Sequence, residues 1–534
     1  MKDLKRVFMV GGKPFFPLGS ERLYSSGYSV PNPSETEAHF KAVKLAHGNT
    51  LAIPVYWDQV EPEEDQFNFT SVDILLTLAR QYEMRLILLW FATWKNGVMD
   101  FAPAWVKDDP KRFKRVVSPI GNEIWVLSSH CKANLEADKK AFVALCDHLK
   151  ANDQDEHTVI GLQIENEPGI IGSDRDYSPE GQKVFENAVP AKLVSAMKSA
   201  GTGDVYKIWQ QAGGKKFGDW TEMFGVEAGE IMSAWSLATY MNEIAKAGKE
   251  VYNIPMFINV WMMEGGWWPV PGEAYPSGGA VHKVLDIYKW FTPQVDFIAP
   301  DNYQPDLNIH QTVNAPYIRD NNPLFIIESD GGYNMFRDIA NDNAIGYFSM
   351  FELDEIGNIY PELMWKVNIM RCVAAAIPLL LKYQGTGKIH AVVQSQPAEQ
   401  ESALYGRTPG LQLDLDGYMG LIQFGRKWEP VMHTDLPDRG GCLVIQANEK
   451  EFYLVGINSR LLLRPKPTIG KSASVLLSSD LSHPSFCNYV VSVDEGHFQP
   501  DGEFVVDRRC NGDLTRGGVW VGNCDTVVRV FTCD

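Results

Sequence analysis

The chain has 534 residues, more than one ordinary domain needs, and 45% of them are hydrophobic against 22% charged, which is typical of a globular protein. Its net charge of −18 argues against nucleic-acid binding, which needs a basic face, and disfavours anionic substrates. No run of 18 or more apolar residues predicts a membrane span. We therefore expect a soluble protein with a neutral substrate, and neither nucleic acid nor a membrane as partner.

Short apolar strands, each followed by an amphipathic stretch, recur along residues 1–384. This alternation predicts parallel strands joined by crossover helices, and eight repeats favour a (β/α)8 barrel. An open doubly wound sheet is the minor alternative, since no strand is followed by the GxGxxG motif. We expect strands at 15–18, 50–55, 85–90, 159–164, 256–260, 297–299, 324–327 and 344–350, and helices at 35–47, 70–82, 134–150, 231–248, 280–290 and 361–382.

From about residue 385 the apolar runs become short and β-rich, with Gly, Asn and Asp turns between them, as in an antiparallel β-sandwich. The chain is therefore expected to consist of a barrel at 1–384 and an all-β domain at 385–534. The segment 168–253, between strands four and five, is expected to be an insertion that adds helices over the rim. The predicted strands of the second domain are 442–446, 452–457, 489–493, 504–506 and 527–531.

The N-terminus carries basic residues, but only four apolar residues follow before Gly11, so it does not read as a signal peptide. The eight cysteines form no CxxC pair and no Cys/His cluster with zinc spacing. Reduced thiols in a cytoplasmic protein are the expectation, with no metal and no cofactor. Because five cysteines follow residue 441, a disulfide there in an exported homologue stays open.

Two glutamates stand where barrel enzymes carry their active sites, at the carboxyl ends of strands. Strand four runs into residues 163–169, which end in Asn166, Glu167, Pro168 and Gly169, and strand seven runs into Glu328. Hydrolysis of a glycosidic bond needs two carboxyl groups flanking the anomeric carbon, about 5–5.5 Å apart for retention and roughly 6.5–9.5 Å for inversion. We predict Glu167 as general acid/base and Glu328 as nucleophile.

Two other carboxylates compete with this pair. Glu165 shares a strand face with Glu167, so it is expected to point inward one layer deeper, as a structural group beside Arg22 or Arg85. Asp330 lies beyond the apolar run of strand seven and is expected in the loop.

Several polar and aromatic residues follow strand ends and are candidates for substrate binding. Asn166 is expected to hydrogen-bond the sugar 2-hydroxyl, and Tyr303 to donate to the nucleophile and hold it ionised. Trp94 and Asn96 are candidates for a stacking platform and a polar contact, with core packing as the competing reading for the tryptophan. Trp261 and the pair 267–268 are candidates for the pocket floor or an interface, with core packing as the competing reading for these tryptophans as well.

The sequence resembles family 35 glycoside hydrolases, the β-galactosidases, in a bacterial branch with an all-β C-terminal domain. The similarity covers residues 11–16, 49–69 and 163–169, Ile327-Glu328 and 510–513. The resemblance implies a retaining exo-acting β-galactosidase. Thr93 stands where other members carry a galactose-contacting glutamate, so selection for galactose is assigned to Asn96, Tyr56 or Trp94.

The sequence thus predicts a double-displacement enzyme that releases terminal β-linked galactose from a neutral oligosaccharide, such as one derived from plant cell walls. A β-glucosidase, β-glucosaminidase or transglycosylase on the same scaffold is the alternative. A non-catalytic carbohydrate-binding protein is more distant, and a metallo-hydrolase is disfavoured because no histidine pair has ligand spacing. The oligomeric state stays open, with a homo-oligomer as one alternative.

Overall fold

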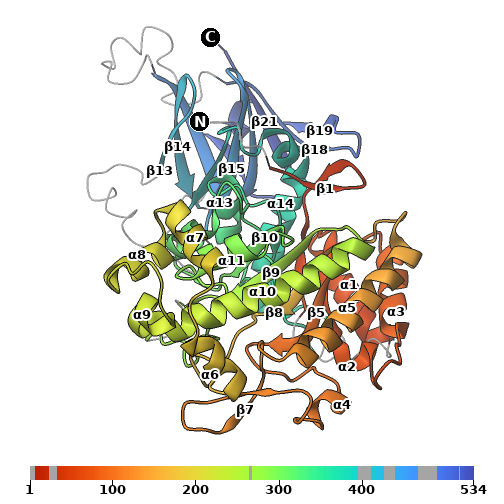
Figure 1. Cartoon of the computed structure of the whole chain (residues 1–534). Coiled ribbons are helices and arrows are strands. Elements are labelled where there is room, and N and C mark those ends of the chain that lie inside the picture. Colours follow the sequence, from red (N-terminus) through yellow and green to blue (C-terminus); the bar gives the residue numbers. More distant parts are fainter. Residues whose placement is uncertain are drawn as a thin grey trace.

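The structure is a computed structural model that describes residues 6–22, 33–263, 268–354, 357–394, 411–425, 439–466, 490–515 and 518–533. Within these ranges, seven parallel strands form a curled sheet in the order β10-β9-β8-β5-β4-β3-β11 (Figure 1). The predicted barrel is confirmed. Its strands are β3 (Leu18–Glu21), β4 (Thr50–Tyr56), β5 (Arg85–Lys95), β8 (Val159–Asn166), β9 (Met256–Trp261), β10 (Phe297–Asp301) and β11 (Tyr347–Phe348).

The segment 324–329 occupies the eighth position, between β10 and β11. Single parallel bridges hold it there, from Ser329 to Asn302 and from Ile326 to Tyr347. The prediction of a regular strand at 324–327 is therefore wrong, because these isolated bridges do not continue into a ladder. They nevertheless place Glu328 in the ring, where its carbonyl accepts the Asn302 N–H at 3.1 Å.

Strand β5 shows why the barrel strands are apolar on both faces. Ile87, Leu89 and Phe91 belong to the cluster that fills the barrel interior, whereas Leu86 and Leu88 belong to the core between the sheet and the helices. A parallel strand covered on both sides reads as a continuous apolar run.

Helices surround the sheet, and α10 packs along α5 outside β5 and β8 (Figure 1). Two small hairpins lie outside the sheet, β1 (Phe8–Val10) with β2 (Lys13–Phe15) and β6 (Arg115–Val117) with β7 (Glu123–Leu127), and Phe8 of the first packs against the barrel interior. The helices are α1 (Pro33–Leu45), α2 (Trp57–Val60), α3 (Thr70–Gln81), α4 (Ala104–Lys107), α5 (Lys132–Asp153), α10 (Ala228–Val251), α11 (Leu285–Phe291), α12 (Leu307–Asn314), α13 (Asn334–Ala340) and α14 (Met364–Tyr383).

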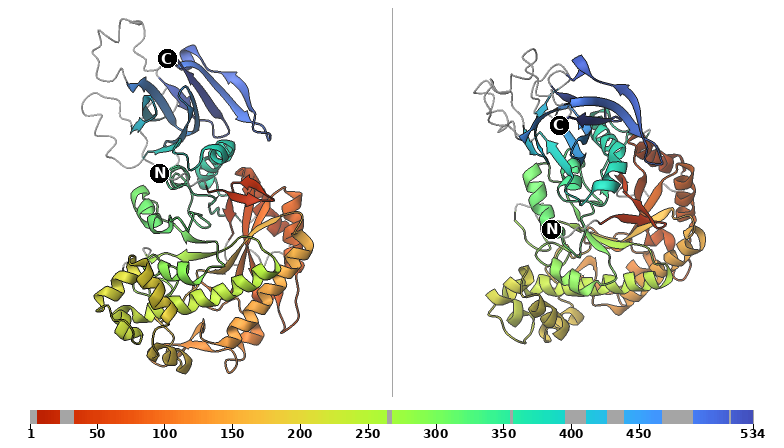
Figure 2. Two further views of the ribbon diagram at one scale, coloured as in Figure 1. Left: turned by 45° about the horizontal axis from the view of Figure 1, so that its top comes forward. Right: turned by 90° about the horizontal axis from the view of Figure 1, so that it is seen from above.

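The segment between β8 and β9 starts on the rim of the barrel and then leaves it. Ile170 N–H donates to the Ser277 carbonyl at 3.0 Å, and Ile171 N–H to the Gly97 carbonyl at 3.2 Å, so loops after three strands meet at the mouth. At Gly169 (φ +156°) a Cβ would lie 2.5 Å from Pro276, so only glycine allows this approach. Further on, α6 (Pro179–Glu186), α7 (Ala191–Ala200), α8 (Asp204–Gln211) and α9 (Trp220–Phe224) gather at the side of the barrel (Figure 2), where α7 and α8 contact α11.

The C-terminal part is an antiparallel β-sandwich, as predicted. Its sheets have the orders β12-β15-β16-β21-β18-β19 and β13-β14-β17-β20. The chain passes from α14, which ends at Tyr383, to β12, which begins at Ile389. The strands are β12 (Ile389–Val393), β13 (Leu411–Asp414), β14 (Tyr418–Phe424), β15 (Gly441–Asn448), β16 (Glu451–Ile457), β17 (Ser459–Pro465), β18 (Val490–Phe498), β19 (Phe504–Arg509), β20 (Val519–Val521) and β21 (Val527–Thr532).

Helix α14 lies between the barrel and the sandwich (Figure 2). Its buried residues share one hydrophobic core with barrel residues and with Leu443, Val455 and Val527 of the sandwich. By length and composition, residues 361–383 form the one helix of the described residues that is apolar enough to cross a membrane. The sequence analysis did not identify it. Half of its most apolar 18-residue window is buried inside the structure. Packing between two layers accounts for this composition. The seven described cysteines are all free, and Cys487 lies outside the described residues.

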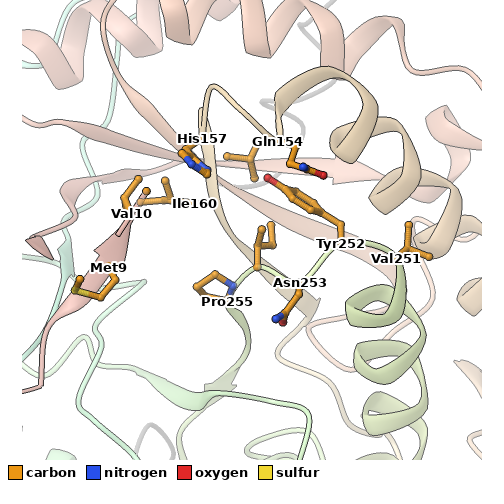
Figure 3. A pocket seen from close by; sticks show the side chains of 12 residues that line it. Met9, Val10, Gln154, His157, Ile160, Val251, Tyr252, Asn253 and Pro255 are labelled. Carbon is orange, nitrogen blue, oxygen red and sulfur yellow. The ribbon is translucent and has the colours of Figure 1, made fainter. Parts of the chain in front are cut away.

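A cavity of about 390 Å³ opens at the end of the barrel where the strands begin. Val159 and Ile160 at the start of β8, together with His157 and Tyr252, line it (Figure 3). It lies at the other end of β8 from Glu167 and is therefore separate from the predicted catalytic pair.

Candidate active site

Four carboxyl groups and a lysine meet inside the mouth of the barrel. Glu21 and Asp301 end β3 and β10, Lys95 ends β5, and Glu167 and Glu328 follow β8 and the segment 324–327. All five side chains are buried. One carboxyl oxygen each of Glu167, Asp301 and Glu328 lies within 4.8 Å of the other two. This spacing matches the short carboxyl separation of about 5 Å that retaining glycosidases need.

Glu328 has the surroundings of an ionised nucleophile. The Tyr303 hydroxyl donates a 2.5 Å hydrogen bond to Glu328 Oε1, as the sequence predicted. Burial raises the pKa of Glu328, whereas the nearby Lys95 ammonium and the hydrogen bonds from Tyr303 and Glu21 oppose that rise. A hydrogen bond and a positive charge on the same carboxylate both favour its charged form.

Glu167 has the surroundings of a proton donor. Burial, followed by the negative charge of Glu328, raises the pKa of Glu167 to about 8. Glu167 is therefore protonated at neutral pH, beside a second carboxyl group that Tyr303 and Lys95 help to keep ionised. Two carboxyls whose environments push their protonation apart divide into an acid and a nucleophile.

The backbone around Glu167 is strained. Glu165 and Glu167 have φ values of 60° and 45°, in the left-handed region that non-glycine residues rarely adopt. Glu167 N–H donates to Asn259 Oδ1 at 2.8 Å, which holds this turn from the neighbouring strand. Strain of this kind persists only where surrounding contacts fix it, and it is common at active sites.

Glu165 lies outside the barrel mouth, so its predicted inward orientation is wrong. The left-handed turn carries its side chain toward α5, where Oε2 accepts the Trp94 N–H at 2.7 Å. Burial and the charge of Asp138 raise the pKa of Glu165 well above its usual range, so the pair shares a proton. The expected partners also need correction, because Arg22 donates to the Phe351 carbonyl and Arg85 to carbonyls at 156–157.

Three residues expected near the sugar are buried elsewhere. The ladder between β5 and β8 is interrupted between Trp90 and Lys95, and this bulge turns Thr93 and Trp94 toward the helices. Thr93 Oγ1 donates to Asp138 at 2.6 Å, and the Trp94 ring packs edge-on against Tyr240. Tyr56 is fully buried in the barrel interior against two phenylalanines. The assignment of Trp94 and Tyr56 to substrate binding is therefore wrong.

The other predicted binding residues lie at the mouth. Asn166 Nδ2 donates to Asn96 Oδ1 at 3.2 Å, and the Lys95 ammonium donates to the same oxygen. Trp261 is half-buried at the end of β9, in register with Asp301. Trp268 is exposed, and Trp267 lies outside the described residues.

Sequence reasoning missed Glu21, Lys95, Asn259 and Asp301. Each lies at or near the carboxyl end of a barrel strand, which is where the polar groups of an active site are expected. Three of the predicted strands, 15–18, 85–90 and 297–299, stopped short of these ends. Extending these three strands by two to five residues to their charged ends would have included Glu21, Lys95 and Asp301, whereas Asn259 already lay inside the predicted strand 256–260.

The spacing of Glu167, Asp301 and Glu328 would also suit a cation that prefers carboxylate oxygens. The Lys95 ammonium, however, already places a positive charge beside Glu167 and Glu328. A second cation would have to overcome the repulsion of that charge. The cluster fits acid–base and nucleophilic chemistry.

Replacing Tyr303 by Phe will remove the hydrogen bond to Glu328 Oε1 and leave the ring in place. Because that bond favours the ionised carboxylate, its loss raises the pKa of Glu328 and moves the acidic limb of the kcat/KM profile to higher pH. We expect kcat to fall by roughly 10- to 100-fold, since a hydrogen bond to a charged group contributes about 1.5–3 kcal/mol. A pH profile with an unmoved acidic limb would contradict this role.

Comparison with known proteins corrects the family. A family model described as β-galactosidase (Glyco_hydro_42) matches residues 30–223, and a domain of unknown function (DUF5597) matches residues 370–522. The match is to family 42, so the resemblance to family 35 is wrong. The predicted enzyme class, a glycoside hydrolase of the β-galactosidase type, is confirmed by the same match.

Similar solved structures include two β-galactosidases and a β-amylase catalytic domain. A catalytic mutant of a family 42 β-galactosidase from G. stearothermophilus has 16% identity and a TM-score of 0.46, over 72% of this chain and 58% of that one. A β-galactosidase from the haloarchaeon Halorubrum lacusprofundi has 16% identity and a TM-score of 0.44, over 67% and 58%. The β-amylase catalytic domain from Paenibacillus polymyxa has 11% identity and a TM-score of 0.44, over 65% and 95%. The chain thus spans little more than half the length of these β-galactosidases. A comparison with curated proteins gives no match.

Proposed function

We propose that the protein is a retaining exo-β-galactosidase with Glu167 as general acid/base and Glu328 as nucleophile. The observation that carries the proposal is the short separation of two buried carboxyl groups, one with its pKa raised to about 8 and the other accepting a hydrogen bond from Tyr303. An inverting enzyme holds its carboxyls roughly 6.5–9.5 Å apart to admit a water, and oxygens within 4.8 Å of each other are closer than that. The family match over residues 30–223, which include Glu167, supports the same chemistry.

The reaction proceeds in two displacements. Glu328 Oε attacks the anomeric carbon while Glu167 transfers its proton to the departing glycosidic oxygen, so the C–O bond breaks as the glycosyl ester forms. Glu167, now ionised, removes a proton from an incoming water, which attacks the same carbon and releases Glu328. Two inversions give net retention. The same glutamate serves both steps because the first step leaves it in the form that the second requires.

The rim supports removal of a single terminal sugar. Loops after β5, β8 and β9 meet through the Ile170–Ser277 and Ile171–Gly97 hydrogen bonds, which wall one side of the mouth. A walled mouth admits a chain end, whereas an endo-acting enzyme needs an open cleft. Galactose differs from glucose only at its axial 4-hydroxyl, so its recognition depends on a few buried polar groups. With Tyr56 and Trp94 buried elsewhere, we assign this selection to Lys95, Asn96 and Glu21.

A panel of aryl β-glycosides tests the proposal. We expect the highest kcat/KM on the aryl β-galactoside, by at least 10-fold over the β-glucoside and β-glucosaminide, because a buried polar group left unpaired by the wrong epimer is costly. Proton NMR of the first product should show the β-anomer of galactose before mutarotation. A preference for the β-glucoside would contradict the assignment of galactose as substrate, but it would not affect the proposed mechanism. A first product that is the α-anomer would contradict the retaining mechanism. Added sugar acceptors in the same assay detect transglycosylation.

A further inference from the structure

A single buried amide on β9 connects the acid/base residue to two other groups. Asn259 Oδ1 accepts the Glu167 N–H at 2.8 Å. Its Nδ2 donates to Asn166 Oδ1 at 3.2 Å and to Asp301 Oδ2 at 2.8 Å. Asn259 is fully buried, so these bonds face no competition from solvent. The position of Asp301 is thus fixed relative to the strained turn that carries Glu167.

The other oxygen of Asp301 has no ordinary hydrogen-bond partner in the described part of the chain. Asp301 Oδ1 is buried and unpaired, although a carboxyl oxygen of Asp301 lies within 4.8 Å of both Glu167 and Glu328. An ionised carboxylate in that position would add a negative charge to a buried site that already holds the Glu328 carboxylate, at a large cost. A protonated carboxyl there has one hydrogen to donate, and the neighbouring carboxyl oxygens can accept it.

We propose that Asp301 is a positioning residue that stays protonated and donates a hydrogen bond to Glu167, and so favours the ionised form that activates water in the second step. This inference rests on the proposed acid/base role of Glu167. Asn259 determines the geometry, because its Nδ2 requires an acceptor and so leaves Oδ1 of Asp301 as the donor toward Glu167.

The charges around both groups fit this assignment. Glu167 is faced by Glu328, by the Lys95 ammonium and by Asp301. Asp301 is faced by the carboxyls of Glu328, Glu167 and Glu21, and no cation is among its main neighbours in the described structure. Burial and these three carboxyls raise the pKa of Asp301 well above its usual range. Because the Lys95 ammonium lies beside Glu167, Glu167 loses its proton at a lower pH than Asp301 does.

Two variants of similar size separate the alternatives. Asp301→Leu removes the donor and adds no charge, so the Glu167 carboxylate loses a hydrogen bond and the basic limb of kcat/KM moves up by about one pH unit. Asp301→Asn keeps a donor, because Asn259 Nδ2 turns the new amide's oxygen toward itself and its NH₂ toward Glu167. That limb then stays within about 0.3 pH unit of wild type. With a substrate whose second step limits turnover, Asp301→Leu also lowers kcat by about 10-fold.

A shift of the basic limb of kcat/KM to lower pH in these variants would overturn the proposal. If Asp301 is an anion in the free enzyme, both variants remove a like charge and the basic limb moves down in both. If neither variant moves the limb, Asp301 is not coupled to Glu167. Should Asp301→Leu fail to fold, the direction seen with Asp301→Asn still separates a neutral Asp301 from an anionic one.

The matched control is Asp153→Asn, at the other end of β8. Asp153 is also buried, and it accepts the N–H groups of Thr158 and Val159. This change should lower the melting temperature without moving either limb of the pH profile. Failure of the proposed function would be seen independently with Glu167→Gln and a substrate that has an activated leaving group. If the basic limb of the pH profile persisted in this variant, Glu167 would not be the acid/base residue.

Discussion

Replacing Glu328 by Ala will lower kcat on an aryl β-galactoside by roughly four orders of magnitude or more, because no other group can form the glycosyl-enzyme. Glu328 is the carboxyl that receives the 2.5 Å hydrogen bond from Tyr303, and it is separated from Glu167 by less than 5 Å. Its removal leaves space for a small anion on the face opposite the leaving group. Azide should therefore restore turnover with an activated substrate and give the α-galactosyl azide, which NMR distinguishes from the β-anomer.

The control for this experiment is Asp330→Ala. Asp330 follows Glu328 by two residues and pairs with Lys366 at 2.7 Å, away from the catalytic cluster. It should retain nearly all of the activity. If Asp330→Ala were as inactive as Glu328→Ala, or if Glu328→Ala retained more than a few per cent of wild-type kcat, the nucleophile assignment would be wrong.

Replacing Glu167 by Ala will separate the two steps of the reaction. Substrates with activated leaving groups need no proton in the first step, so the glycosyl-enzyme should form rapidly and accumulate as a burst. Its hydrolysis should slow by roughly 100- to 10,000-fold, since no general base remains to activate water. Added azide should restore turnover and give the β-galactosyl azide, because a small anion needs no base. An α-azide from this variant would exchange the roles of the two glutamates.

Glu165→Gln is the matched control for the acid/base residue. Glu165 lies two positions away with the same left-handed backbone, but its carboxyl is paired with Asp138 and with the Trp94 N–H. The change keeps a neutral side chain that can donate to Asp138 and accept the Trp94 N–H, so stability should stay close to that of the wild type and turnover should be independent of azide. An azide-rescued Glu165→Gln would show that the wrong glutamate has been assigned.

The sequence was a sufficient guide to the barrel and to the proximity of Glu167 and Glu328 at its mouth. Apolar runs at strand spacing are visible without coordinates, and Glu167 and Glu328 each follow such a run directly. The binding residues were harder to predict, because a bulge in β5 turns Thr93 and Trp94 to the helical side, and positive φ at Glu165 reverses its side chain. Neither departure from strand alternation has a glycine or proline to mark it.

The segment around Glu328 shows a related limit. Its apolar pattern predicts a regular strand, but single bridges on each side hold it in the ring. An apolar sequence pattern indicates that both faces of a segment are buried. It does not indicate how many ladder hydrogen bonds the segment forms with its neighbours. Likewise, the charged groups Glu21, Lys95 and Asp301 converge from three strands far apart in the sequence, and their proximity follows from the closure of the ring.

The place of α14 has a consequence for how the chain can be divided. The match to the C-terminal family begins at residue 370, inside α14, and the core that contains this helix extends into both lobes. A chain cut at residue 384 would keep the helix and remove strands β15, β16 and β18, which contact α14, so the side of the helix that carries Cys372 would be exposed to water. The lobes should consequently melt in one cooperative transition, and the sandwich acts as a folding partner of the barrel.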